Sequence, residues 1–390
     1  LYDHLQAAGA CHGEAAGWER PNWYAPPGIP AEYEYSYGRQ NWFDYSAAEH
    51  RAVRCNVGLF DQSSFAKYRL EGRDAARVLN WVCANDIDVQ PGRIVYTQWL
   101  NERGGIEADL TVTRLDEHSF LIVTAAATEV RDFYWLKAHI PADAHCVLTN
   151  LTSAMGVISL MGPKSRDFLQ TLTPSDLSNE AFRFGTSREI ELEYALVRAS
   201  RITYVGELGW ELYIPTEFVV GVYEAITAAG EAHGLVHAGY HALDSLRIEK
   251  AYRHWGHDIT DEDSPLEAGL GFAVKFDKPG GFIGREALLR QKTKGVPRRL
   301  VQFRLCDPLP LLHRTEPVWC EGRIAGHITS GNYGHSLGGS IGLGYVDDSL
   351  VKDLPAVQAD RFEIEVAGER IPAEASLRPM YDPFGKCIRC

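Results

Sequence analysis

The chain has 390 residues and a formal net charge of −13, and 45% of its residues are hydrophobic. This length suits two or three domains, and the composition is that of a folded protein. The negative charge argues against nucleic acid as a partner, because phosphate binding needs clustered Lys and Arg. No apolar run approaches the roughly 18 residues that a membrane span requires, so we expect no membrane partner.

The eight cysteines are too sparse for a disulfide framework, so we expect a reducing compartment. This favours the cytoplasm or, in a eukaryote, the mitochondrial matrix. Cys387 and Cys390 form a CxxC without a second pair or an adjacent His. His233, His237 and His241 recur every four residues, but glycines within the run would break a helix. We therefore predict no metal site.

Residues 1–40 are predicted to form an N-terminal arm. A short amphipathic helix over 1–8 precedes a stretch rich in Gly, Pro and aromatic residues, 18–28. That composition predicts extended chain and turns rather than a core element. Its many rings suggest that the arm lies over another surface, such as a neighbouring domain.

A first α+β unit is predicted for residues 41–152, in which helices and strands alternate. Gly104 and Gly105 between two apolar runs indicate a β-hairpin. Asp109 is a carboxylate inside the second of these strands, and burying it without a partner would cost several kcal/mol. It is therefore exposed, paired, or part of a site. We expect helices over 46–57, 73–82 and 128–139, and strands over 94–100, 106–113 and 119–124.

A boundary near residue 152 precedes a second α+β unit, residues 153–238, whose element order resembles a split βαβ arrangement. A separate helix is expected over 239–252, followed by a Gly-rich link. The last part of the chain is almost entirely strand-like, which predicts a small antiparallel barrel or sandwich with a polar Gly loop at 330–339. In the second unit we expect strands over 156–161, 191–200 and 210–214 and helices over 165–172 and 219–229. Strands in the last part are expected over 300–305, 317–320, 323–329, 342–346, 361–366 and 371–377.

Six stretches spread in order along the chain form a recognisable set: 58–63 (GLFDQS), 96–109, 201–211 (RITYVGELGWE), 246–249 (LRIE), 329–338 and 378–381 (RPMY). Together they resemble the aminomethyltransferase (T-protein) family of the glycine cleavage system. More closely, they resemble the folate-binding C-terminal half of dimethylglycine and sarcosine dehydrogenases. The resemblance implies an α+β fold of three domains in a ring around a tetrahydrofolate channel, with a C-terminal antiparallel β-barrel. It also implies a discontinuous first domain, 41–152 plus about 239–285, and a barrel domain over 286–390.

The resemblance also names candidate site residues. Asp109 aligns with the family's essential Asp, near N5 and N10 of tetrahydrofolate, and is the candidate catalytic residue. Glu211 aligns with the pterin-binding Glu, whose carboxylate can accept two hydrogen bonds from the pterin edge. Tyr96 and Tyr204 align with site tyrosines whose rings can pack against the cofactor.

Three further residues are candidates for cofactor binding. Arg247 and Arg378 could hold the anionic tail of folate, or could instead form structural salt bridges. Tyr381 belongs to the same short motif as Arg378. The chain departs from the T-protein pattern at Ala108, where a second acid is expected, and at Leu243, where T-proteins carry a substrate-binding Arg. An aminomethyl-lipoyl protein is therefore not the expected partner.

The implied function is tetrahydrofolate-dependent one-carbon transfer. Formaldehyde or an iminium from oxidative demethylation of a methylated amine, such as dimethylglycine or sarcosine, would give 5,10-methylenetetrahydrofolate. FAD would belong to a missing domain or a partner, because no Gly-x-Gly-x-x-Gly follows a strand in this sequence. Two alternatives stay open: a stand-alone tetrahydrofolate-dependent demethylase or methyltransferase, and a non-catalytic folate-binding regulatory module.

Overall fold

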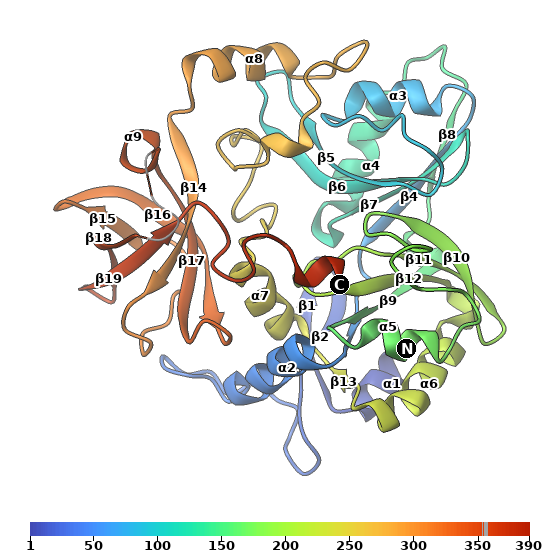
Figure 1. The fold of residues 1–390 in the computed structure, drawn as a ribbon, viewed down its shortest axis with the longest axis horizontal. Helices are drawn as coiled ribbons and strands as arrows, with labels where there is room; N and C mark the ends of the chain where they lie inside the picture. The colour runs from blue at the N-terminus through green and yellow to red at the C-terminus, as the bar shows by residue number, and fades with distance from the viewer. Residues whose placement is uncertain (353, 355–357) are drawn as a thin grey trace.

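The computed structural model describes residues 1–352, 354 and 358–390. Figure 1 shows a five-stranded sheet at the upper right, a six-stranded sheet at the lower right and a closed barrel at the left. Helix α7 (Tyr240–Glu249) lies between the barrel and the six-stranded sheet. Every helix in the described ranges is too short or too polar to cross a membrane.

The five-stranded sheet contains the predicted hairpin and has the order β5-β6-β7-β4-β8. Its strands are β4 (Ala66–Glu71), β5 (Ile94–Leu100), β6 (Ile106–Arg114), β7 (Ser119–Thr124) and β8 (Val147–Asn150). Helices α3 (Ala75–Val82) and α4 (Glu129–Ala138) cover one face, where Trp99, Leu110 and Phe120 are fully or almost fully buried. Because side chains alternate along a strand, Gln98 and Asp109 point to the opposite face.

The six-stranded sheet has the order β10-β11-β12-β9-β3-β13. Its strands are β3 (Gly58–Asp61), β9 (Met155–Met161), β10 (Ser187–Leu192), β11 (Ala195–Ser200), β12 (Gly209–Pro215) and β13 (Val236–His237). The outer face forms a core with helices α1 (Tyr2–Ala7), α5 (Ser165–Gln170) and α6 (Val219–Gly230). Because β3 pairs with β9, this sheet crosses the predicted boundary near residue 152.

The prediction of a single strand over 191–200 is wrong. Strands β10 and β11 form an antiparallel pair in which Leu192 faces Ala195. The turn between them places Glu193 at φ 52°, a left-handed conformation that is uncommon for a residue other than Gly. No Gly, Pro or Asn marks this turn in the sequence, which is why pattern reasoning joined the two strands.

The predicted helix over 1–8 is present as α1, but the prediction that 18–28 holds no core element is wrong. Strands β1 (Ala10–Ala15) and β2 (Trp18–Tyr24) form a hairpin, and Trp23 is fully buried with its ring stacked on Tyr45 of helix α2 (Phe43–Cys55). A Cβ on Gly239 would lie 2.2 Å from the carbonyl oxygen of Asn22, so β2 approaches the start of α7 very closely. The arm therefore packs on helices of its own chain.

The C-terminal part is a closed antiparallel barrel in the order β14-β17-β16-β15-β18-β19, as predicted. Its strands are β14 (Arg298–Leu305), β15 (Pro317–Cys320), β16 (Arg323–Gly334), β17 (Gly339–Asp347), β18 (Gln358–Val366) and β19 (Glu369–Ser376), and the short helix α9 (Asp348–Val351) follows β17. Residues 330–334 of the predicted loop belong to β16, where they pair with β17. An unpredicted helix, α8 (Arg285–Lys294), packs its Leu288 with Leu100 and Ile106 of the five-stranded sheet.

Candidate functional site

The five-stranded and six-stranded sheets face each other with the sides that are not covered by helices. Side chains of β7 cluster with Tyr213 of β12 between the sheets. Val123 of β7 belongs to this cluster and pairs with Thr111 of β6. Asp109 lies two residues from Thr111 on the same strand, so its side chain points to the same face of the sheet. Glu211 lies two residues before Tyr213 and so shares its face of β12. Both predicted carboxylates therefore face the space between the sheets.

Asp109 is held by two polar neighbours on β5. Gln98 Nε2 donates a hydrogen bond to Asp109 Oδ1 over 2.8 Å, and the Tyr96 hydroxyl donates a second. Burial raises the pKa of Asp109 to about 6, although both hydrogen bonds and the charge of Arg253 act in the opposite direction. The carboxyl is thus poised between its two protonation states near neutral pH, as a proton-transfer group requires.

Glu211 is 4% exposed and accepts a hydrogen bond of 2.6 Å from the Tyr213 hydroxyl. Burial raises the pKa of Glu211 to about 7, and that hydrogen bond opposes the shift. Among the described residues, no Lys, Arg or His forms an ion pair with it. A carboxylate can accept about four hydrogen bonds, so Glu211 keeps acceptor capacity for a ligand.

The two predicted tyrosines each lie in a pair of aromatic rings. Tyr96 stacks with Phe272 at 6.1 Å between ring centroids, and Tyr204 stacks with Tyr252 at 6.0 Å. The Tyr204 hydroxyl donates to the carbonyl oxygen of Arg253 over 2.8 Å. Burial raises the pKa of Tyr204, and the charge of Asp109 contributes to the shift, so the two residues lie within electrostatic reach.

The predicted arginines differ in their surroundings. Arg247 is 2% exposed, and its guanidinium pairs with Asp244 at 2.6 Å and Asp258 at 2.7 Å. This supports the salt-bridge alternative for Arg247, because two carboxylates already take up its donors. Arg378 is exposed after β19, with its guanidinium 5.9 Å from the ring centroid of Phe384.

Tyr381 lies in the segment after β19 and belongs to a polar cluster that connects this segment to α2 and α7. Its hydroxyl donates to Glu207 over 2.7 Å, and the guanidinium of Arg54 lies 3.8 Å from its ring centroid. Arg54 also pairs with Glu207 at 2.9 Å and with Glu249 at 2.8 Å. Tyr381 is therefore held by neighbouring side chains of its own chain.

Sequence reasoning missed Gln98, Arg253 and Phe272. Gln98 could have been found, because strand alternation and the hairpin register place it beside Asp109. Arg253 lies shortly after the C-terminal end of α7, and no sequence motif identified it as a site residue. Its donors hold the carbonyl oxygens of Ala251 and Ala268, which leaves its positive charge without a carboxylate partner among the described residues.

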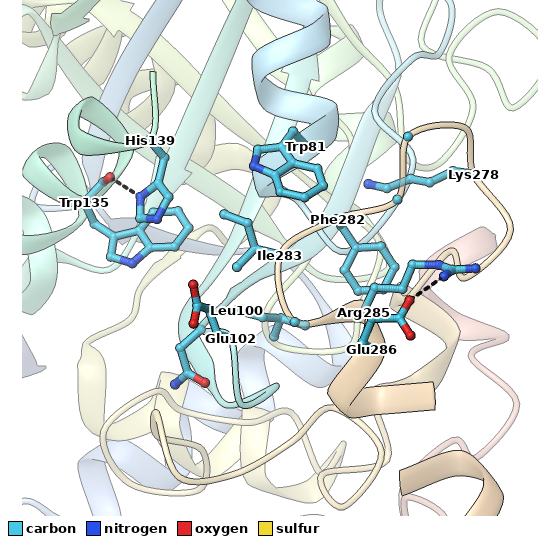
Figure 2. A pocket seen from close by; sticks show the side chains of 14 residues that line it. Trp81, Leu100, Glu102, Trp135, His139, Lys278, Phe282, Ile283, Arg285 and Glu286 are labelled. Atoms are coloured by element: carbon cyan, nitrogen blue, oxygen red, sulfur yellow. Dashed lines mark hydrogen bonds and ion pairs between the residues drawn. The ribbon is translucent and has the colours of Figure 1, made fainter. Parts of the chain in front are cut away.

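A surface cleft of about 770 Å³ lies on the other side of the five-stranded sheet. It is lined by side chains of α3, α4 and the segment before α8, and Figure 2 shows the rings of Trp81, Trp135 and Phe282 around Ile283. Helices α3 and α4 cover the face opposite Asp109. The cleft is therefore separate from the predicted site residues.

Comparison with protein families gives two adjoining matches. The GCVT N-terminal domain matches residues 1–278, and the glycine cleavage T-protein C-terminal barrel domain matches residues 298–382. The chain belongs to the glycine cleavage T-protein family. The crystal structure of aminomethyltransferase T from Bartonella henselae matches 98% of the chain and 97% of its own length, with a TM-score of 0.83 and 26% identity. The predicted family and α+β fold are thus confirmed.

Two longer relatives match the chain from end to end. A 4-methylaminobutanoate oxidase (formaldehyde-forming) of Paenarthrobacter nicotinovorans is 44% identical over all of the chain and 46% of that protein. Mitochondrial sarcosine dehydrogenase of Homo sapiens is 38% identical over all of the chain and 47% of that protein. The chain spans about half the length of these two relatives.

Proposed function

We propose that this member of the T-protein family binds tetrahydrofolate between the two sheets and transfers a one-carbon unit to it. The observation that carries the proposal is the pair of carboxylates that face the same space, a half-buried Asp109 and a buried Glu211. Among the described residues, neither forms an ion pair with Lys, Arg or His, and burial raises the pKa of both. A desolvated carboxylate is unfavourable unless a ligand supplies donors to it. The pterin edge, with its ring N–H and amino group, supplies such donors to Glu211.

Each site residue then has a role that follows from its surroundings. Tetrahydrofolate, when bound, supplies the nucleophilic nitrogens N5 and N10. Asp109 accepts and returns a proton beside these nitrogens, because its raised pKa makes both protonation states accessible. Gln98 fixes the orientation of the carboxyl through its hydrogen bond of 2.8 Å. Tyr96 and Tyr204 exclude water with their rings, and the exposed Arg378 is the remaining candidate for the anionic tail.

The one-carbon unit in this proposal is formaldehyde or an iminium from oxidative demethylation of a methylated amine, and the product is 5,10-methylenetetrahydrofolate. The names of the two longer relatives, a formaldehyde-forming oxidase and a sarcosine dehydrogenase, support this choice. An FAD-containing domain or subunit would perform the oxidation. Leu243, where the T-protein pattern has Arg, supports the same choice over transfer from an aminomethyl-lipoyl protein.

The test is formation of 5,10-methylenetetrahydrofolate from formaldehyde and tetrahydrofolate by the purified chain, measured above the uncatalysed condensation. We expect Asp109→Asn to lower the catalysed rate by about 10², the scale of a lost general acid–base group. Glu117→Gln, an exposed carboxylate beyond the same strand, is the matched control and should keep the parent rate. An Asp109→Asn variant as fast as the parent would remove Asp109 from the reaction.

A further inference from the structure

The tail after the barrel, residues 377–390, is anchored to the rest of the chain. Figure 1 shows it leaving β19 and crossing from the barrel toward the six-stranded sheet. In the middle of the tail, Asp382 pairs with Lys250 at 3.2 Å. At its far end, Arg201, which directly follows β11, donates to the carbonyl oxygen of Cys390 over 2.9 Å. The tail therefore holds the one CxxC of the sequence in a defined place.

The two cysteines of this CxxC lie one turn apart. Cys387 begins the 3-10 helix Cys387–Arg389, and Cys390 follows it directly. In a 3-10 helix, residues three positions apart lie above one another, with about 6 Å between their Cα atoms. Two cysteines can form a disulfide when their Cα atoms are about 4.4–6.8 Å apart. The backbone of the turn therefore allows a bond between the two sulfur atoms.

The turn is also stabilised from the side that precedes it. The two carboxylate oxygens of Asp382 accept hydrogen bonds from the backbone N–H groups of Lys386, over 2.9 Å, and Cys387, over 3.1 Å. Ile388, between the two cysteines, is 9% exposed. The cysteines are thus presented by a folded turn, which reduces the entropy lost when their sulfur atoms are brought together.

Both cysteines carry free thiols, and the two thiols differ in their surroundings. Cys390 is exposed, and a thiolate there lies within electrostatic reach of Arg201. A nearby guanidinium stabilises a thiolate, which is the form that attacks a disulfide. Cys387 is half-buried, and burial raises its pKa. Cys390 is therefore suited to be the attacking thiol, and Cys387 the thiol that completes the bond.

Metal binding is another use of a CxxC, but the surroundings of this pair do not favour it. A structural Zn²⁺ needs four ligands. In the part of the chain that the structure describes, no third Cys, His, Asp or Glu joins the pair in a group that could hold a metal ion. The guanidinium groups of Arg166 and Arg201 both donate to the carbonyl oxygen of Cys390, and their positive charges would oppose a cation.

We propose that Cys387 and Cys390 are a redox-active dithiol, which a low-molecular-weight disulfide such as oxidised glutathione converts to an intramolecular disulfide. The Cys390 thiolate attacks one sulfur of glutathione disulfide and releases one glutathione thiolate. The Cys387 sulfur then attacks the Cys390 sulfur, breaks its bond to glutathione and releases the second glutathione thiolate. The two cysteines lose two electrons and glutathione disulfide gains them, while the two thiol protons pass to the released glutathione. No group of the folate site takes part, so the proposal is independent of the proposed function.

The test equilibrates the reduced, purified chain with mixtures of reduced and oxidised glutathione and then blocks the remaining thiols with N-ethylmaleimide. Cleavage after Lys386 by a Lys-specific protease gives a peptide with both cysteines, whose mass distinguishes dithiol, disulfide and mixed disulfide. We expect the intramolecular disulfide as the main oxidised form. Its equilibrium constant with glutathione should be at least about tenfold greater in the folded chain than in the chain unfolded in urea, because the folded turn holds the two thiols together.

Three variants separate the roles of the thiols. Cys387→Ser should leave Cys390 as a mixed disulfide with glutathione, and Cys390→Ser should react with glutathione disulfide more slowly than Cys387→Ser does. Cys55→Ser is the matched control, because Cys55 is exposed at the end of α2 and has no cysteine at CxxC spacing. It should leave the equilibrium constant unchanged. Equal constants in the folded and unfolded chains, or a mixed disulfide as the main oxidised form of the parent, would overturn the proposal.

Discussion

Replacing Asp109 with Asn should stabilise the fold, in addition to slowing the reaction. Burial raises the pKa of Asp109 from its usual 3.8 to about 6. Each pKa unit corresponds to about 1.4 kcal/mol, so the ionised carboxyl destabilises the fold by up to about 3 kcal/mol. Asp109 keeps some solvent contact, which reduces the expected gain in the free energy of unfolding to about 1–2 kcal/mol. Asn can still accept the hydrogen bond from Gln98.

The raised pKa of Asp109 determines how the stability of the parent fold changes with pH. Between about pH 4 and pH 6 the folded chain holds a proton on Asp109 that the unfolded chain has lost, so the parent loses stability as pH rises. Above about pH 6, the difference in the free energy of unfolding between the parent and the Asp109→Asn variant is constant.

Urea unfolding of both chains at about pH 4 and about pH 7.5 measures this difference. We expect equal stability at the lower pH and a more stable variant at the higher one. A variant that is less stable than the parent at the higher pH would show that the ionised carboxylate is paired in the fold, and the reasoning would fail.

Two substitutions of arginine have expected effects of different kinds. Arg54→Met should lower the free energy of unfolding by about 3–5 kcal/mol, because it leaves Glu207 and Glu249 buried without their cation; urea unfolding measures the loss. Arg253→Met should shift the acidic limb of the pH–rate profile to higher pH, because the charge of Arg253 now lowers the pKa of Asp109.

Each of these substitutions has a control elsewhere in the chain. Arg69→Met breaks an ion pair with Glu71 in which both side chains are 41% exposed, and should cost less than about 1 kcal/mol. Arg323→Met removes an exposed charge on the barrel and should leave the pH–rate profile unchanged. Equal losses for Arg54→Met and Arg69→Met, or an acidic limb that stays in place in Arg253→Met, would contradict these expectations.

Local patterns predicted the elements that carry the site. The glycine pair and its flanking apolar runs predicted the β5–β6 hairpin, and the lone carboxylate within it drew attention to Asp109. Short strands with turn residues predicted the barrel. These features depend on residues close together in the sequence, so periodicity and turn chemistry are sufficient to find them.

Features that depend on distant residues could not be predicted in the same way. The ion pair of Arg247 joins it to Asp258, 11 positions away, across the end of a helix. The hydrogen bonds from Arg253 to Ala268 and the stack of Phe272 on Tyr96 join segments from different elements. The turn at Glu193 has no glycine to mark it. Tertiary packing decides each of these, and single-sequence patterns do not contain that information.

The most direct test of the folate site is a calorimetric titration of the chain with tetrahydrofolate at about pH 8, where Glu211, with its pKa of about 7, is mostly ionised. The account predicts binding by the parent that Glu211→Gln weakens by roughly 10- to 100-fold, the effect of losing a charged hydrogen-bond acceptor. Glu191→Gln, an exposed carboxylate on β10 of the same sheet, should bind as the parent does. A parent chain that does not bind, or a Glu211→Gln variant that binds equally tightly, would contradict the account.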